Sequence, residues 1–270
     1  MKENEKYAYV TLLGTDDYVI GALCLEVSLK RVGSKHPLIV LCSKNILKAT
    51  IDLLKRRGIR CRALTHNVSI GKINTGVFER WNYTFDKLQV FGLIEYKKVV
   101  FLDSDMYVVK NMDHLFEKPH MSSVYADVWD KTAAVGLNSG LMVIEPSKKE
   151  YEGLVRLLHS DRFANSTMFG DQDVIRAYYS DWIQKTECRL PVGYNLYYPF
   201  VNEYLRQSKA DDIFNIHFVY DKKPWQFSFP ALLRRLRKFH KSYLIRYMAL
   251  VYRFRLLIWL YGIGFRSDGK

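Results

Sequence analysis

The 270-residue chain lacks the features that mark secreted, membrane-spanning and repeat proteins. Its four cysteines (Cys24, Cys42, Cys61 and Cys188) show neither a C-x-x-C pair nor metal-finger spacing, which fits a reducing compartment. The first residues contain no apolar signal-peptide run, and no uncharged apolar stretch of about 18 residues occurs. We find no internal repeat. These absences lead us to expect a cytoplasmic protein with no ordinary membrane-spanning helix.

Acidic residues are also missing from one long part of the chain, between Asp221 and Asp268. The net charge of +13 is concentrated there. Residues 1–221 contain 29 basic and 27 acidic side chains, whereas residues 222–270 contain 12 and 1. A nearly neutral globular part is thus followed by a strongly basic tail, which is typical of proteins that contact an anionic partner.

Strand-like and helix-like stretches alternate through the globular part. Apolar and β-branched runs predict strands at Tyr7–Leu13, 37–42, 59–64, 99–109, 122–127, 140–144 and 213–220. Helical spacing predicts helices at 18–31, 48–57, 85–95, 151–159 and 173–179. This alternation predicts an α/β fold with a mostly parallel, doubly wound central sheet.

Two carboxylates interrupt the most apolar of these strands, VVFLDSDMYVV at residues 99–109. If the strand is extended throughout, Asp103 and Asp105 point to the same side. Ligands bind at the carboxyl ends of strands in open α/β sheets, so the pair could hold a divalent cation and, through it, a diphosphate. An Asx-rich turn explains the same residues equally well, and the D-x-D pattern alone leaves both interpretations open.

Three other features have ordinary structural explanations when each is taken by itself. The polar turn at residues 14–17 does not match G-x-G-x-x-G, which favours a simple helix cap over a nucleotide cradle. Asp171, near the start of a predicted helix, suits an N-cap. His217 lies in an apolar run, where a lone histidine is usually a hydrogen-bonded core residue.

The tail interleaves basic residues with Leu, Ile, Phe, Tyr and Trp from residue 229 to residue 265. This pattern is typical of a helix that lies in a membrane interface, and we favour contact with an anionic membrane surface. A helix packed on the domain with a solvated basic face is the first alternative. Nucleic-acid binding is the second and is less favoured, because the aliphatic runs would stay exposed.

Several motifs occur in an order that resembles glycosyltransferase family 8, especially its glycogenin-like and galactinol-synthase-like members. They are the first strand with its T-D-D-Y turn, F-D-K-L, F-L-D-S-D-M, L-N-S-G, F-G-D-Q-D, the Y-N loop and H-F-x-x-x-x-K-P-W, between Tyr7 and Trp225. The resemblance implies a Rossmann-like GT-A fold and a retaining, metal-dependent nucleotide-sugar transferase. We expect one such domain at about residues 1–228, followed by a basic amphipathic helical tail at residues 229–270, which lies outside the resemblance.

The resemblance also implies a role for individual residues. Asp103, Asp105 and His217 would bind Mn²⁺, and Lys223 would neutralise the departing diphosphate. Asp171 and Gln172 would lie by the anomeric carbon, as catalytic residues together with Lys223. The remaining donor-binding residues would be Leu12, Thr15 and Tyr18 at the uridine and ribose, Lys87 near the phosphates or the donor sugar, Asn138 and Ser139 at the donor sugar, and Ser104.

Two positions depart from the family pattern: Tyr220 replaces a glycine before K-P-W, and Met168 replaces an acidic residue before G-D-Q. In addition, none of Tyr197, Tyr198 and Tyr204 matches the self-glucosylated tyrosine of glycogenin.

From the resemblance we expect transfer of glucose or galactose from a UDP-sugar to a glycan, lipid-linked or protein acceptor. The alternatives are a self-glucosylating primer and a non-catalytic binding module. The tail would place the protein on the cytoplasmic face of a membrane, and a homodimer is a further option that the family offers.

Overall fold

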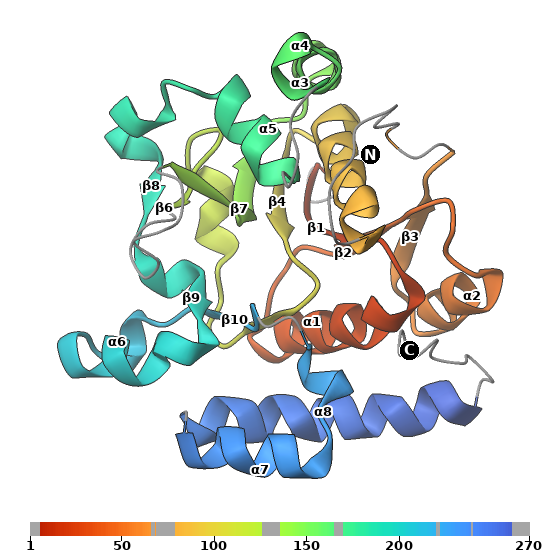
Figure 1. Ribbon diagram of the computed structural model, residues 1–270, viewed down its shortest axis with the longest axis vertical. Helices are drawn as coiled ribbons and strands as arrows, with labels where there is room; N and C mark the ends of the chain where they lie inside the picture. Colours follow the sequence, from red (N-terminus) through yellow and green to blue (C-terminus); the bar gives the residue numbers. More distant parts are fainter. Residues whose placement is uncertain are drawn as a thin grey trace.

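The structure is a computed structural model and describes residues 6–65, 68, 79–125, 136–164, 170–219, 222–238 and 240–260. A seven-stranded sheet with the order β3-β2-β1-β4-β7-β6-β8 forms the centre of the molecule (Figure 1). Its strands are β1 (Tyr7–Leu13), β2 (Leu38–Cys42), β3 (Arg60–Ala63), β4 (Lys98–Leu102), β6 (Ser123–Tyr125), β7 (Leu137–Ile144) and β8 (Arg189–Leu190). A second sheet of order β5-β10-β9 consists of β5 (Met106–Val108), β9 (Leu196–Tyr197) and β10 (Asn215–His217).

The central sheet is mostly parallel, as the alternation of strands and helices predicts. β3, β2, β1 and β4 pair in parallel, and β6 pairs in parallel with β8. β7 runs antiparallel to both of its neighbours, β4 and β6. After β1, the chain forms β2 on one side of β1 in the sheet, whereas β4 lies on the other side of β1. The strand order therefore reverses between β1 and β4.

Helices cover both faces of this sheet. The α-helices are α1 (Val19–Arg31), α2 (Lys48–Arg56), α3 (Lys148–Leu158), α4 (Asp161–Ala164), α5 (Asp171–Tyr178), α6 (Val201–Gln207), α7 (Phe229–Lys238) and α8 (Lys241–Leu260). Short 3₁₀ segments connect them, among them η2 (Asp16–Tyr18), η4 (Asp113–Glu117), η8 (Val192–Tyr194) and η11 (Pro224–Gln226), and the longer η3 spans Glu79–Gly92. α1, α2 and α8 contribute to one buried cluster, while η3, α3 and α5 contribute to the other.

Side chains of the central strands alternate between the two clusters. In β4, Val100 and Leu102 enter the α1 side, whereas Val99 and Phe101 enter the η3 side. All four are fully buried, which explains why the strand reads as an unbroken apolar run.

The stretch 99–109 is not the single strand that its composition predicts. β4 ends at Leu102, residues 103–105 turn, and the Met106 amide donates a hydrogen bond to the Asp103 carbonyl at 3.2 Å. β5 then joins the second sheet against β10. The turn carries both carboxylates out of the apolar sheet, where burial without partners would be unfavourable.

Two further predictions were wrong in detail. The helix expected at 85–95 is 3₁₀ in type and ends earlier, at Gly92, within the segment η3. The strand expected at 213–220 shortens to β10, at Asn215–His217.

Asp113 in η4 ties together three segments near the amino end of β1. Its carboxylate accepts hydrogen bonds from the Tyr9 hydroxyl at 3.0 Å, the Ser34 hydroxyl at 2.8 Å and the Lys35 amide at 2.8 Å. Burial alone would raise the pKa of Asp113, but these hydrogen bonds outweigh it and lower the pKa below its usual value.

The basic tail forms two helices that lie side by side next to α1, on the far side of the molecule from α3 and α5 (Figure 1). One face of α8 is built into the core, where Leu244, Tyr247, Val251, Phe254 and Ile258 are fully buried. This face of α8 is therefore packed on the domain, as the first alternative for the tail predicts. Among the described residues, no helix combines the length and apolar character needed to cross a membrane.

Candidate active site

The polar residues of the predicted site meet where the strand order reverses. β1 and β4 both end at this edge of the sheet, and Asp103 follows β4 directly. β7 runs the other way, so Asn138 and Ser139, which follow its first residue, arrive at the same edge. An open α/β sheet binds ligands at such a reversal.

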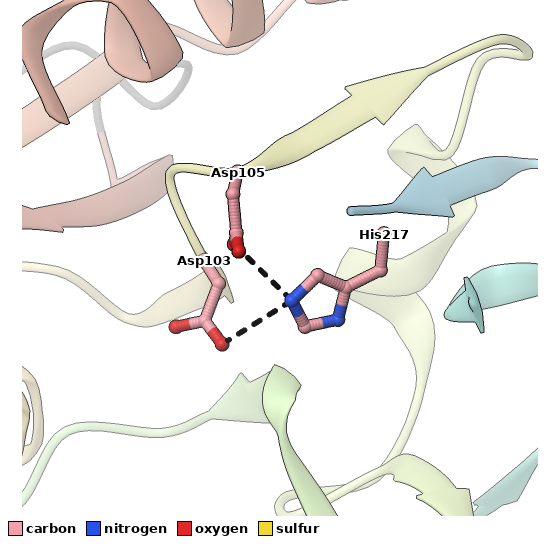
Figure 2. Close-up of side chains that lie close together, drawn as sticks. All are labelled: Asp103, Asp105 and His217. Atoms are coloured by element: carbon pink, nitrogen blue, oxygen red, sulfur yellow. Dashed lines mark ion pairs between the residues drawn. The ribbon is translucent and has the colours of Figure 1, made fainter. Parts of the chain in front are cut away.

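Asp103, Asp105 and His217 face one another in Figure 2. The His217 Nε2 lies 3.1 Å from Asp105 Oδ1 and 3.9 Å from Asp103 Oδ2, and one ligand atom from each residue lies within 4.8 Å of the others. The side chains of Asp105 and His217 are nearly buried, while that of Asp103 is 28% exposed. Two carboxylates and one imidazole suit a divalent cation that also takes ligand oxygens from a substrate.

Asn195 sets the orientation of the His217 ring. Its Oδ1 lies 2.8 Å from His217 Nδ1, and its Nδ2 donates to Asn138 Oδ1 at 2.7 Å. An amide oxygen accepts only, so Nδ1 carries the proton in this hydrogen bond and Nε2 keeps its lone pair in the neutral ring. The imidazole is thereby held in the form that ligates a metal ion.

Gly140 leaves space beside these groups. A Cβ atom at this position would lie 2.9 Å from Asn138 Oδ1, 3.0 Å from His217 Cε1 and 3.1 Å from Asp103 Oδ2. A hollow therefore lies between β7 and these three side chains, and a single methyl group would crowd it. The donor set and this hollow together fit a bound cation.

Lys87 from η3 lies deeper in the same site. Its Nζ lies 3.1 Å from Asp103 Oδ1, 2.8 Å from Asp171 Oδ2 and 3.3 Å from the Ser139 hydroxyl. Burial alone would lower the pKa of Lys87, but the two carboxylates outweigh burial and raise it. The lysine is thus a fixed cation. Burial close to two other carboxylates raises the pKa of Asp103, although Lys87 and His217 oppose the change.

Lys223 reaches the site from the segment before η11. Its Nζ lies 2.7 Å from Asp105 Oδ2 and donates to the Phe218 carbonyl at 3.3 Å. Burial alone would raise the pKa of Asp105, but Lys223 and His217 outweigh burial and lower it well below the usual range. Asp105 is consequently an anion that is paired with Lys223.

These residues line one cavity of about 460 Å³, a volume in the range of small-molecule sites. The structure brings together every predicted site residue there: Leu12, Thr15, Tyr18, Lys87, Asp103, Ser104, Asp105, Asn138, Ser139, Asp171, Gln172, His217 and Lys223. Six further residues of the lining have no predicted role: Gly14, Tyr83, Thr84, Gly140, Tyr197 and Val219.

Asp171 is not the N-cap that its position in the sequence suggests. Gly170 precedes α5 and receives the cap from Asp173, whose Oδ2 accepts the Gly170 amide at 2.9 Å. Asp171 instead accepts the Ser139 hydroxyl at 2.9 Å, and Gln172 Oε1 accepts the Ser139 amide at 2.9 Å. Both side chains are therefore turned toward the cavity.

Two motif residues that sequence reasoning left without a role orient the site. Asn195 belongs to the Y-N loop and Gly140 to L-N-S-G, so the motifs contained both. Tyr197 follows in the same loop, and its hydroxyl accepts the Asn138 Nδ2 at 2.6 Å. The two departures from the family pattern, Tyr220 and Met168, lie outside the described residues.

The family model of glycosyl transferase family 8 matches residues 9–228. The chain belongs to this family. The family 8 match ends immediately before α7 and includes every residue of the cavity lining. The protein is therefore a glycosyltransferase, as the resemblance implies, and its mixed α/β architecture is the expected GT-A fold.

Two curated relatives illustrate the range of this family. The chain is 28% identical to Galactinol synthase 6 of Arabidopsis thaliana over 82% of this chain and 74% of that protein. It is 29% identical to Glycogenin-1 of Oryctolagus cuniculus, over 85% and 68% respectively. The share of a relative that the chain spans varies widely, from 31% to 82%.

Among solved structures, the galactosyltransferase LgtC in complex with donor and acceptor sugar analogues has the same fold. The TM-score is 0.66 at 15% identity, covering 90% of this chain and 95% of that one. Family 8 membership and this fold imply a nucleotide-sugar donor, a glycan acceptor and a divalent metal, for which the cluster of Asp103, Asp105 and His217 offers a site.

Proposed function

We propose that this chain is a retaining hexosyltransferase that uses Mn²⁺ and a UDP-sugar, with glucose or galactose as the transferred sugar. The observation that carries the proposal is the convergence of Asp103, Asp105 and His217 with Lys87 and Lys223 in one cavity of about 460 Å³. In this proposal the reaction belongs to residues 1–228, and residues 229–270 serve another purpose.

The charge of the cavity supports a bound cation. Its charged lining residues are Asp103, Asp105, Asp171, Lys87 and Lys223, which sum to −1 when His217 is neutral. A negatively charged cavity would repel the diphosphate of a nucleotide sugar, whereas a divalent cation would change the sum to +1. A sugar diphosphate therefore binds favourably when the cation is present.

Mn²⁺ held by Asp103, Asp105 and His217 would supply Lewis-acid stabilisation of the diphosphate as it leaves. Lys223 would neutralise charge on the same leaving group after releasing Asp105. Leu12, Thr15 and Tyr18 would hold the nucleoside end.

At the sugar end, Asp171 would stabilise positive charge that develops at the anomeric carbon. Its Oδ2 is already held by Lys87 and Ser139, so the carboxylate is fixed and needs no reorganisation. Asn138, Ser139 and Gln172 would position the donor sugar. Retention could proceed with Asp171 as a nucleophile or by same-face attack, in which the leaving phosphate accepts the proton of the acceptor.

The first test is release of UDP from a panel of UDP-sugars with and without Mn²⁺. We expect Mn²⁺-dependent release from one sugar, and loss of that release in Asp105→Asn. Asp181→Asn is the matched control, because Asp181 forms an exposed pair with Lys185 and neither residue lines the cavity. Absence of release together with absence of Mn²⁺-dependent UDP binding in calorimetry would overturn the proposal and favour a non-catalytic binding module.

Mass spectrometry of the intact protein after incubation with UDP-glucose separates a transferase from a self-glucosylating primer. A primer gains hexose on a tyrosine. Of the three tyrosines nearest the family position, Tyr198 is fully buried, Tyr204 is 8% exposed and Tyr197 lines the cavity. We expect the mass to stay unchanged.

For the acceptor, we propose a lipid-linked or surface glycan presented on the cytoplasmic face of a membrane. The charge asymmetry supports this choice, because residues 222–270 hold 12 basic side chains against 1 acidic one.

A further inference from the structure

The long C-terminal helix α8 has two apolar faces. Its inner face packs against α1 and η11 and includes Leu244, Tyr247, Val251 and Phe254, all fully buried. The opposite face carries Ile245, Ala249, Tyr252 and Leu256, at the spacing i, i+4, i+7 and i+11 of a single helical stripe. We call these four residues the outer stripe.

The outer stripe is open to solvent. Ile245 is 54% exposed, Tyr252 47% and Leu256 62%, and Ala249 is exposed as well. Scattered exposed apolar residues are normal on a protein surface, but an aligned row along a helix is typical of an interaction site. Packing of α8 on the domain needs only the inner apolar face. The outer stripe has no role in that packing, so we look for a partner outside the domain.

Basic residues border the stripe. Arg246, Arg253 and Arg255 are exposed on α8, and the adjacent helix α7 adds exposed Arg234 and Arg237. α7 also exposes Phe229 (67%) and Leu233 (39%). No acidic residue occurs between 229 and 260. The α7–α8 hairpin therefore presents apolar side chains within a field of one sign of charge.

We infer that the outer stripe of α8 is a docking surface for an anionic lipid bilayer. The stripe would lie at the boundary between headgroups and acyl chains, with the flanking arginines at the phosphates. This inference rests on the proposal of a membrane-borne acceptor and names the surface that brings the catalytic domain to it.

Charge distinguishes this occupant from the others. A second copy docked through the same face would bring two acid-free basic hairpins together, and like charges repel. A nucleic acid would match the arginines but leave the outer stripe in water. A bilayer with anionic lipid provides partners for both the charge and the apolar row.

The inner face of α8 connects the docking surface to the metal cluster. The Tyr247 ring stacks on Phe218 with centroids 4.4 Å apart and contacts Tyr107 edge-on at 5.7 Å. Phe218 directly follows His217, and its amide donates to the Asp105 carbonyl at 3.0 Å. A bilayer bound to the outer stripe would thus hold the cavity at one fixed orientation.

The test uses the full chain, because removing α8 would uncover the core. Co-sedimentation is measured with phosphatidylcholine vesicles that contain or lack phosphatidylglycerol. We expect binding that requires the anionic lipid and weakens with salt. The double variant Ile245→Ser/Leu256→Ser should bind at least about tenfold more weakly. Ile94→Ser is the matched control, because Ile94 is 63% exposed and lies outside the hairpin.

The inference would be overturned if the wild type did not bind to anionic vesicles. It would also be overturned if the wild type and the stripe variant bound to them equally well. Salt-sensitive binding to an RNA or DNA oligonucleotide without vesicle binding, or a dimer in sedimentation velocity that the stripe variant dissociates, would overturn it too. UDP release in solution is measured on the same samples. It should not change in the stripe variant, so failure of docking is distinguishable from failure of the proposed reaction.

Discussion

Gly140 offers the sharpest test of the metal cluster, because even a methyl side chain there would crowd two of its residues, Asp103 and His217, together with Asn138. In Gly140→Ala the new Cβ would lie 2.9 Å from Asn138 Oδ1, 3.0 Å from His217 Cε1 and 3.1 Å from Asp103 Oδ2. All three are side-chain atoms, so they can move while the strand β7 stays in place. The substitution should therefore disturb the site more than the fold.

The size of the disturbance follows from these distances. Restoring ordinary contacts of 3.4 Å requires shifts of about 0.3 Å in the Asp103 side chain, about 0.4 Å in that of His217 and about 0.5 Å in that of Asn138. Metal sites tolerate about 0.2 Å in ligand distance, so the shifts exceed what the cluster can absorb. We expect the affinity for Mn²⁺ to fall about 10–100-fold, the range seen when groups that orient metal ligands are changed. Overpacking should lower the free energy of unfolding by no more than about 1–3 kcal/mol.

Mn²⁺ binding is measured by calorimetry, and UDP release is titrated with Mn²⁺. Gly92→Ala is the matched control, because a Cβ at Gly92 would meet Tyr151 at an ordinary 3.4 Å. In Gly140→Ala, release should recover at high Mn²⁺ if the effect is on the metal ion. A folded Gly140→Ala protein with wild-type Mn²⁺ affinity would refute the assignment of this hollow to the cation.

Three further substitutions test other parts of the structure. Gly21→Ala would place a Cβ against the Ser104 carbonyl oxygen, closer than van der Waals contact allows. It should lower the free energy of unfolding by about 1–3 kcal/mol in urea denaturation, although alanine is the better helix former. Lys87→Met leaves the buried Asp171 and the partly exposed Asp103 without their cation and should lower that free energy by about 3 kcal/mol, whereas the exposed Lys185→Met should change it by less than about 0.5 kcal/mol. Asp113 has a lowered pKa when folded, so its stabilisation is present above the unfolded pKa and is lost as the pH falls through the folded pKa. Asp113→Asn should therefore reduce stability by about 1 kcal/mol at neutral pH and little in strong acid, and equal losses at both would contradict this assignment.

The central sheet was largely predictable because its strands are buried on both faces. β1, β2 and β4 consist of side chains that enter one cluster or the other, so the sequence reads as continuous apolar runs. The family motifs then supplied the site, and the residues they name line one cavity. His217 shows the limit of residue-by-residue reasoning, because an apolar run around a histidine describes a core residue as well as a ligand.

Geometry that depends on distant partners could not be predicted. The break after β4 occurs because two carboxylates must leave the sheet, and composition alone does not show where the chain turns. Asn195 acquires its function from His217, a neighbour only in the fold. The second face of α8 was likewise hidden, because basic and apolar residues interleave in the same way whether one face or two are apolar.

The reversal of β7 explains why a mostly parallel sheet can assemble this site at all. In a fully parallel sheet, the edge that binds ligands receives only the residues that follow each strand. β7 pairs antiparallel with β4, with Leu102 opposite Leu141, so the beginning of β7 lies at the end of β4. Asn138 and Ser139 thereby reach Asn195 and Lys87 while remaining within a strand, where the Ser123 hydroxyl donates to the Asn138 carbonyl and the Ser139 amide donates to Gln172. The sequence order L-N-S-G before an apolar run is the arrangement that this direction requires, since the same residues would have to follow the run in a parallel strand.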